Sequence, residues 1–125
     1  LIKTIAVFKN VGIRVSIFVD PIIAMVEAAA TTGTDRIELY TESYATAFTN
    51  GNKETAIVPY IEAAILAHKL GLGINAGHDL NQANLKFFVE STKNIKEVSI
   101  GHALITESLY TGLESTIKSY LDILK

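Results

Sequence analysis

Short, largely β-branched apolar runs recur along this chain, and a stretch with helical spacing follows each of them. The runs are predicted to be strands at 13–20, 36–41, 72–75 and 97–100. Helices are predicted at 1–10, 22–31, 54–70, 81–91, 103–107 and 111–125. The polar stretch 42–53 is predicted to be a loop. Strands and helices that alternate in this way imply right-handed crossovers and a parallel sheet. The sequence therefore predicts an α/β fold.

Four such units are half of the eight that build a TIM (β/α)8 barrel, whose full size is roughly 250 residues. The chain has 125 residues, and we interpret 1–125 as a single domain, a half barrel of four parallel strands with covering helices. It lacks an initiator methionine and begins as if within a helix, so we expect it to start inside a longer protein. A small open α/β sheet is the alternative architecture. The absence of a G-x-G-x-x-G segment argues against dinucleotide binding.

The composition gives no support to several classes of function. The formal net charge is -2 and no basic stripe is present, so neither nucleic acid nor an anionic membrane is an expected partner. No apolar run reaches the roughly 18 residues of a membrane span. The chain has no cysteine, which excludes disulfides and thiolate metal sites and is compatible with the cytoplasm.

Two Gly-His pairs form the strongest chemical signal, because each follows a predicted strand. Gly77-His78-Asp79 comes after the third run, and Gly101-His102 after the fourth. In parallel α/β folds, ligands bind at the carboxyl ends of the strands, and in barrels the last two loops often hold a phosphate. Glycine lets backbone N–H groups approach an anion, a helix N-terminus adds partial positive charge, and histidine transfers protons near neutral pH. The pairs therefore predict a phosphate site with an acid–base group.

Structural explanations remain open for these residues. Asp79 suits the N-cap of the following helix, and His102 suits a polar strand end. His68 lies on the side of a predicted helix and is expected to be structural or solvated. The three histidines come from separate elements without an i, i+4 pair, so no metal site is expected, and no cofactor is predicted.

Glu38 is the sharpest single candidate. It stands between Ile37 and Leu39 in the second predicted strand, and strand alternation places it on the same face as Tyr40. A carboxylate facing a barrel interior must be paired or have a perturbed pKa, which favours a functional role. An ion pair with Arg14 or Arg36 is the structural alternative.

Together, these segments resemble the pyridoxine 5′-phosphate synthase family, which closes the pyridoxine ring in the deoxyxylulose-dependent vitamin B6 pathway. The matching segments are Arg-Val-Ser-Ile-Phe-Val-Asp at 14–20, Arg-Ile-Glu-Leu-Tyr-Thr at 36–41, Leu-Gly-Leu-Gly-Ile-Asn-Ala-Gly-His-Asp-Leu-Asn at 70–81 and Ile-Gly-His-Ala-Leu-Ile at 100–105. The resemblance covers essentially the whole chain, but only the C-terminal half of the family's TIM barrel.

The resemblance implies a reaction and a role for each candidate. The family condenses 3-amino-2-oxopropyl phosphate with 1-deoxy-D-xylulose 5-phosphate to pyridoxine 5′-phosphate, phosphate and water. His78 matches the family's proton donor, and Glu38 matches the glutamate regarded as stabilising the transition state. Asp79 matches a substrate-phosphate contact that is often glycine. Gly101 and His102 match the pair that contacts the aminooxopropyl phosphate.

Two departures from the family limit what the resemblance implies. The family commonly has His-Thr-Gly after the strand glutamate, whereas this chain has Tyr40-Thr41-Glu42. The N-terminal half, which would supply a further catalytic histidine, a catalytic glutamate and the grip on deoxyxylulose phosphate, is not in these residues. We therefore expect the chain alone to be inactive, and the family implies a cytoplasmic homo-oligomer acting on phosphorylated small molecules. The alternatives are a non-catalytic half barrel that binds a phosphorylated ligand, or another phosphate-handling TIM barrel.

Overall fold

The computed structural model describes residues 1–125 and contains one parallel sheet of four strands. The strands are β1 (Ser16–Val19), β2 (Arg36–Tyr40), β3 (Gly73–Gly77) and β4 (Ile95–Ser99). They lie in the order β1-β2-β3-β4, so each strand pairs with its neighbour in the sequence. The expected α/β fold is confirmed, and a parallel sheet in sequential order is what half of a (β/α)8 barrel requires.

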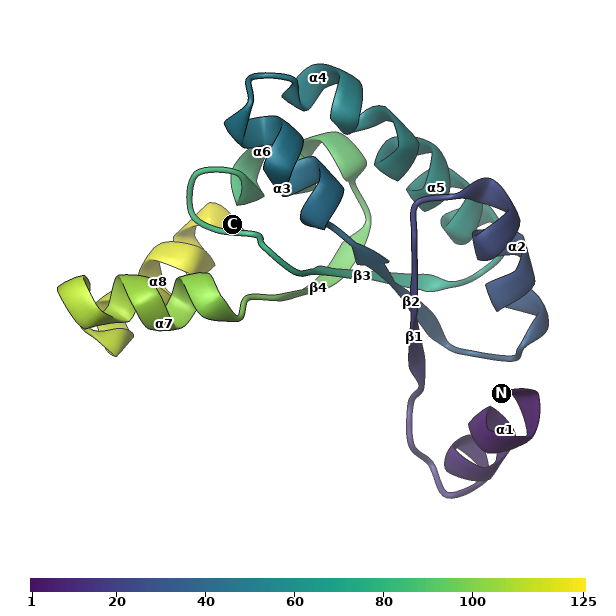
Figure 1. Ribbon diagram of the computed structural model, residues 1–125. Coiled ribbons are helices and arrows are strands. Elements are labelled where there is room, and N and C mark those ends of the chain that lie inside the picture. The colour runs from purple at the N-terminus through teal and green to yellow at the C-terminus, as the bar shows by residue number, and fades with distance from the viewer.

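Eight helices accompany the sheet (Figure 1). They are α1 (Ile2–Asn10), α2 (Ile23–Thr31), α3 (Glu42–Thr49), α4 (Lys53–Ala56), α5 (Val58–Lys69), α6 (Leu85–Thr92), α7 (His102–Thr111) and α8 (Leu113–Ile123). Helices α2 to α6 lie on one side of the sheet, while α1 lies below the start of β1 and α7 and α8 lie beyond the end of β4 (Figure 1). None of the helices is long and apolar enough to cross a membrane.

The prediction of a loop over 42–53 is wrong, because α3 and α4 occupy most of it. The Ser, Thr, Asn and Gly content suggested a loop, but Tyr44 and Phe48 are four residues apart and therefore share one face of a helix. Tyr44 is fully buried, and its ring lies 5.9 Å from that of Phe48. Tertiary packing of these rings overrides the weak local propensity. Pro59 stands in the first turn of α5, where its missing N–H breaks no helical hydrogen bond.

Helix α2 begins without a side-chain cap. An Asp-Pro pair ahead of a helix predicts an aspartate N-cap with proline at the first helical position, but the N-cap of α2 is Ile22 and Asp20 does not cap it. The backbone N–H of Ile22 instead donates to the carbonyl oxygen of Asp20 at 2.7 Å. The tight turn at Pro21 therefore stands outside the helix.

The two faces of the sheet have opposite environments. Ile37 and Leu39 are fully buried against the helices, whereas Glu38 and Tyr40 point to the other face, as strand alternation predicts. No helix covers that second face (Figure 1), and Phe18 on it is 58% exposed. In a barrel this face is the interior. Strands β1 and β4 each have an unpaired edge, so the sheet is open on two sides.

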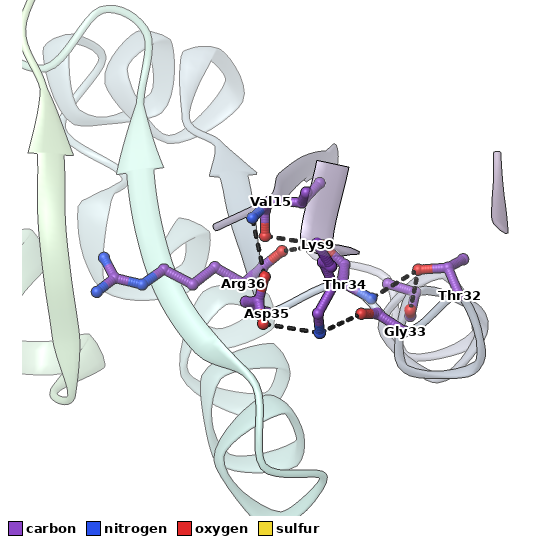
Figure 2. Close-up of polar contacts among 8 residues, drawn as sticks. Lys9, Val15, Thr32, Gly33, Thr34, Asp35 and Arg36 are labelled. Carbon is purple, nitrogen blue, oxygen red and sulfur yellow. Dashed lines mark hydrogen bonds and ion pairs between the residues drawn. The ribbon is translucent and has the colours of Figure 1, made fainter. Parts of the chain in front are cut away.

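A polar network fastens α1 to the amino end of the sheet (Figure 2). Lys9 donates to the carbonyl oxygen of Gly33 and pairs with Asp35, both at 2.8 Å. Asp35 also accepts the backbone N–H of Val15 at 2.9 Å. The hydrogen bonds from Lys9 and from the Val15 N–H lower the pKa of the Asp35 carboxyl below its ordinary value. This end of the sheet is thus held by regular, charge-assisted contacts.

Candidate active site

A hollow of about 1070 Å³ lies at the opposite, carboxyl end of the sheet. Its lining comes from the end of β2 with α3, the loop after β3, and the β4–α7 connection. The lining residues are Tyr40, Glu42, Ala45, Thr46, Thr49, His78, Asp79, Leu80, Asn81, Ser99, Ile100, Gly101, His102, Ala103, Leu104, Ile105 and Thr106. Four of the five predicted site residues therefore line one cavity, and the fifth, Glu38, precedes the lining residue Tyr40 by two positions in β2.

His78 follows the last residue of β3, and its side chain is exposed. The imidazole meets the ring of Phe18 edge-on at 5.3 Å between centroids and that of Tyr40 at 4.8 Å. These rings come from β1 and β2, so two neighbouring strands fix the position of the histidine. An exposed imidazole held in place at a cavity wall suits proton transfer to a bound ligand.

The backbone at this position is unusual. His78 and Asp79 have φ angles of 78° and 57°, so two successive non-glycine residues occupy the left-handed region. The expectation that Asp79 caps a helix starting at Asn81 is wrong, since α6 begins at Leu85 and Asn84 is its N-cap. The intervening segment is a loop because Asn81 and Asn84 bond to each other's backbone, which satisfies N–H groups that a helix would otherwise use. His78 therefore lies on a strained loop and not at a helix N-terminus.

Glu38 lies against β3. A Cβ atom placed on Gly77 would lie 2.5 Å from Glu38 Oε1, so the carboxylate occupies space that any other residue at position 77 would fill. Arg14 and Arg36, the expected structural partners of Glu38, pair with Glu97 instead, at 2.8 and 2.9 Å. Glu38 forms no ion pair, so the structural alternative considered for it is wrong.

The two arginines and Glu97 belong to a separate polar layer on the barrel face, nearer the amino end of the strands. Arg36 also donates to Asn75 Oδ1 at 3.0 Å, and Asn75 Nδ2 donates to Glu97 at 3.2 Å. Partial burial raises the pKa of the Glu97 carboxyl, but the two guanidinium groups outweigh it and hold that pKa below its ordinary value. This layer lies toward the amino end from Tyr40 and Gly77, with Asn75 in register between Glu38 and Glu97.

The second Gly-His pair begins a helix. Gly101 is the N-cap of α7 and His102 its first residue, and no side chain caps this helix. His102 was considered as a strand end, but β4 stops at Ser99. The first N–H groups of an uncapped helix are free to bind an anion, and nothing lies within 4 Å of the space where a Gly101 side chain would be. No three His, Asp or Glu side chains gather as a metal-ligand set.

Two further contacts join the elements of the site. Gln82 Nε2, in the loop after β3, donates to Glu107 on α7 at 2.7 Å, and so connects the loops that carry the two Gly-His pairs. Tyr40 donates its hydroxyl to Glu42 at 2.7 Å. This hydrogen bond, followed by partial burial and the negative charges of Glu42 and Asp79, raises the pKa of the Tyr40 hydroxyl. The residues that depart from the family's His-Thr-Gly pattern therefore contact each other.

Sequence reasoning did not identify Thr41 and Asn84 as parts of the site. Thr41 is fully buried, and its hydroxyl lies within hydrogen-bonding distance of the carbonyl oxygens of Gly77, at 2.6 Å, and of His78. Asn84 Nδ2 donates to the carbonyl oxygen of Asp79 at 3.1 Å. The contacts span 36 or more residues for Thr41, so no local pattern indicates them.

Comparison with known proteins identifies the same family that the sequence segments resemble. The family model described as pyridoxal phosphate biosynthesis protein PdxJ matches residues 1–125. Pyridoxine 5′-phosphate synthase of Christiangramia forsetii is 60% identical over 123 residues, which cover 98% of this chain and 52% of that protein. The synthase of Cytophaga hutchinsonii is 60% identical over 125 residues, 100% of this chain and 52% of the relative. That of Xanthomonas oryzae pv. oryzae is 52% identical over 125 residues and 49% of its length. The chain thus spans about half the length of these relatives, and matches their C-terminal half.

Proposed function

Since this chain belongs to the PdxJ family of pyridoxal phosphate biosynthesis proteins, we propose that it is the C-terminal half of a pyridoxine 5′-phosphate synthase. The observation that carries the proposal is the meeting of three adjacent strands at one end of the sheet. Glu38 comes from β2, His78 follows β3, and the Gly101-His102 pair follows β4. A phosphorylated ligand in the hollow would contact the His78 loop and the Gly101-His102 pair, and Glu38 lies on the strand between the ring-bearing β1 and β3.

The phosphate of 3-amino-2-oxopropyl phosphate is proposed to bind at the start of α7. Gly101 permits close approach, and the free N–H groups of the first helical turn, together with the His102 side chain, bind the anion. Asp79, in the facing loop, lines the same hollow. This arrangement would anchor the amino ketone so that its reacting carbons lie between the loop after β3 and β2.

His78 is proposed to transfer the proton during ring closure, and Glu38 to stabilise the charge that develops. The imidazole is exposed to the hollow and braced by Phe18 and Tyr40, so it reaches a ligand without a change of backbone. Glu38 lies beneath Gly77 without a cationic partner, so its carboxylate remains free to interact with positive charge on the condensing amine. A positioned general acid of this kind contributes about 10²–10⁴-fold to a rate.

The barrel face of this chain needs a partner segment. It exposes Phe18 and leaves the edges of β1 and β4 unpaired, which in an isolated chain invites association. We propose that the N-terminal half of the full-length protein pairs with these edges, closes the barrel and supplies the rest of the active site. By the same family argument, the full-length protein is proposed to be a cytoplasmic homo-oligomer.

The test is an assay of pyridoxine 5′-phosphate formation by the complete protein and by residues 1–125 alone. We expect turnover by the complete protein only, and recovery of turnover when the two halves are mixed. Turnover by the lone chain contradicts the shared active site. A complete protein that binds inorganic phosphate, and loses that binding in His102→Ala, but never forms product would instead support a non-catalytic phosphate-binding barrel.

A further inference from the structure

Three successive carbonyl groups around the candidate catalytic histidine are held by side chains from two other elements. The carbonyl oxygens of Gly77 and His78 both lie at the hydroxyl of Thr41, and that of Asp79 accepts the Asn84 amide. The Thr41 backbone N–H adds a bond to the Gly77 carbonyl at 3.0 Å. The segment that carries His78 is therefore fixed at every peptide from position 77 to 79.

Both of these residues stand where a side chain ordinarily serves its own helix. Thr41 is the N-cap of α3 and Asn84 the N-cap of α6, and threonine and asparagine are favoured at N-caps because their side-chain oxygens bind the first N–H groups. Neither caps its helix here. Each side chain is turned instead to the loop after β3. Two helices thus forgo a stabilising cap, and the loop gains the hydrogen bonds.

These contacts explain how the loop keeps its shape. His78 and Asp79 both have positive φ, a conformation that costs free energy in residues other than glycine and persists only where surrounding contacts enforce it. Asn84 is itself fixed, since its carbonyl oxygen accepts the buried Tyr44 hydroxyl at 2.7 Å and its Oδ1 accepts the Asn81 N–H at 2.8 Å. Thr41 and Asn84 therefore contact the backbone carbonyl groups on both sides of the left-handed pair.

We propose that Thr41 and Asn84 are positioning residues for the proton transfer by His78. By holding the backbone in the left-handed form, they keep the imidazole between Phe18 and Tyr40 and directed into the hollow. This inference rests on the proposed function, in which His78 moves the proton. It adds that the rate depends on two buried residues that do not line the hollow.

The molecule contains a matched control for Thr41. Thr34, at the other end of β2, is also a buried threonine whose hydroxyl contacts two carbonyl oxygens, those of Val15 and Arg36, each at 3.0 Å (Figure 2). Thr34 does not line the hollow. Thr34→Val and Thr41→Val therefore remove the same group, with the same shape retained, from opposite ends of one strand.

The experiment measures steady-state kinetics of Thr41→Val, Thr41→Ser, Asn84→Asp and Thr34→Val in the complete protein. A displacement of about 1 Å in a catalytic group costs on the order of 10²-fold in rate. We expect Thr41→Val to lower kcat by roughly 10–100-fold while KM for the aminooxopropyl phosphate stays within about twofold. Thr41→Ser, which keeps the hydroxyl, is expected to restore kcat, and Thr34→Val to leave it unchanged. Asn84→Asp removes the donor to Asp79 but keeps the Oδ1 acceptor, and is expected to lower kcat in the same way.

A wild-type kcat in a folded Thr41→Val variant overturns the proposal, as does an equal loss in Thr34→Val. If Thr41→Val does not fold, Asn84→Asp tests the proposal instead, and a wild-type kcat in that variant overturns it. A second readout does not require turnover: the imidazole signal of His78 in a proton–carbon spectrum of histidine-labelled protein. It is expected to shift or broaden in Thr41→Val and to remain in place in Thr34→Val. If the wild type makes no product, the proposed function fails, whereas an unmoved His78 signal in Thr41→Val refutes the positioning role by itself.

Discussion

Hydrogen bonds to backbone carbonyl groups join neighbouring elements at both ends of the sheet, but the backbone that they hold differs between the two ends. At the amino end, an ion pair from Lys9 to Asp35 and the Thr34 hydroxyl join α1, β1 and β2, and only the glycine of this network has a positive φ (Figure 2). At the carboxyl end, the Thr41 hydroxyl makes equivalent contacts, but to a loop with two left-handed residues. One end uses its hydrogen bonds to hold the fold, and the other uses them to hold a strained conformation beside a cavity.

The glycines at the two ends of β3 also face different side chains. At Gly73 an added Cβ would lie 2.7 Å from Arg36 Cγ, and at Gly77 it would lie 2.5 Å from Glu38 Oε1. Arg36 is paired with Glu97, whereas Glu38 has no cationic partner. Barrel enzymes place stability at the amino end and chemistry at the carboxyl end of the strands. The comparison therefore predicts that equal substitutions at the two ends change different measured quantities.

The largest effect is expected for His78→Asn in the complete protein. Asparagine tolerates the left-handed backbone, so the loop keeps its shape while the proton-transfer group is lost. The rate of pyridoxine 5′-phosphate formation is expected to fall by about 10²–10⁴-fold. The free energy of unfolding is expected to change by less than about 0.5 kcal/mol because the side chain is exposed. Rate assays and urea denaturation measure the two quantities, and full activity would contradict the role given to His78.

Gly77→Ala is expected to have the next largest effect. The new methyl group would overlap Glu38 Oε1 and approach Ser99 Cβ at 2.9 Å, so the carboxylate must leave its place. Overpacking of this kind destabilises by about 1–3 kcal/mol, and the displaced Glu38 is expected to reduce the rate as well. Gly73→Ala is the matched control. It displaces the stem of Arg36 and is expected to reduce stability without changing kcat, and a loss of kcat there would weaken the contrast between the two ends.

Much of this architecture was predictable from the sequence because it depends on local periodicity. The alternation of apolar runs and helical spacing fixed the parallel order, and the alternation in β2 placed Glu38 and Tyr40 on the barrel face. The predicted residues His78, Asp79, Gly101 and His102 line one hollow. Strand ends are informative in this fold class because parallel strands bring all their carboxyl ends to one edge.

The errors have a common physical cause, which is side-chain packing and hydrogen bonding that form only in the folded chain. Tyr44 and Phe48 form a helix where composition indicated a loop, because their rings pack in the core. Asp79 is not an N-cap because Asn84 donates to its carbonyl and delays the helix. Thr41 showed no local sign of its role, since its partners lie in the next strand unit. The composition of each segment does not show such contacts, because the folded arrangement sets them.

A smaller effect, on stability alone, is expected for Asp35→Asn at the amino end. Its bonds with Lys9 and the Val15 N–H hold its pKa below the ordinary value of 3.8, so the carboxylate stabilises the fold above that pH. This contribution is lost as the pH falls through the lowered value. We expect the variant to lose about 1 kcal/mol at neutral pH, since the pair is partly exposed. The difference from wild type is expected to shrink as the pH falls below 3.8 and to vanish once the pH has passed the lowered pKa.

Urea denaturation between neutral and acid pH measures the Asp35 effect. Asp122→Asn is the control, because its pairing with Lys125 lies on an exposed helix end and is expected to contribute little. The rate of the complete protein should remain at the wild-type value for both variants. A stability difference that does not depend on pH would show that the carboxylate of Asp35 is not what fastens α1.

The smallest effect is expected for Tyr40→Phe, which keeps the ring against His78 and removes only the hydrogen bond to Glu42. We expect kcat to stay within about threefold of wild type, because one exposed hydrogen bond has a modest net value. The bond raises the pKa of the hydroxyl above 10.0, so its stabilising contribution is present below that pH and is lost as the pH rises through the folded value. The ultraviolet difference titration between wild type and Tyr40→Phe isolates this tyrosine. In Glu42→Gln the same titration should move back toward 10.0. Tyr40→Phe could instead lower kcat as far as Thr41→Val does. That result would show that the turnover rate depends on the Tyr40 hydroxyl and not only on its ring, and it would make the Tyr40–Glu42 hydrogen bond part of the machinery at the carboxyl end of the sheet.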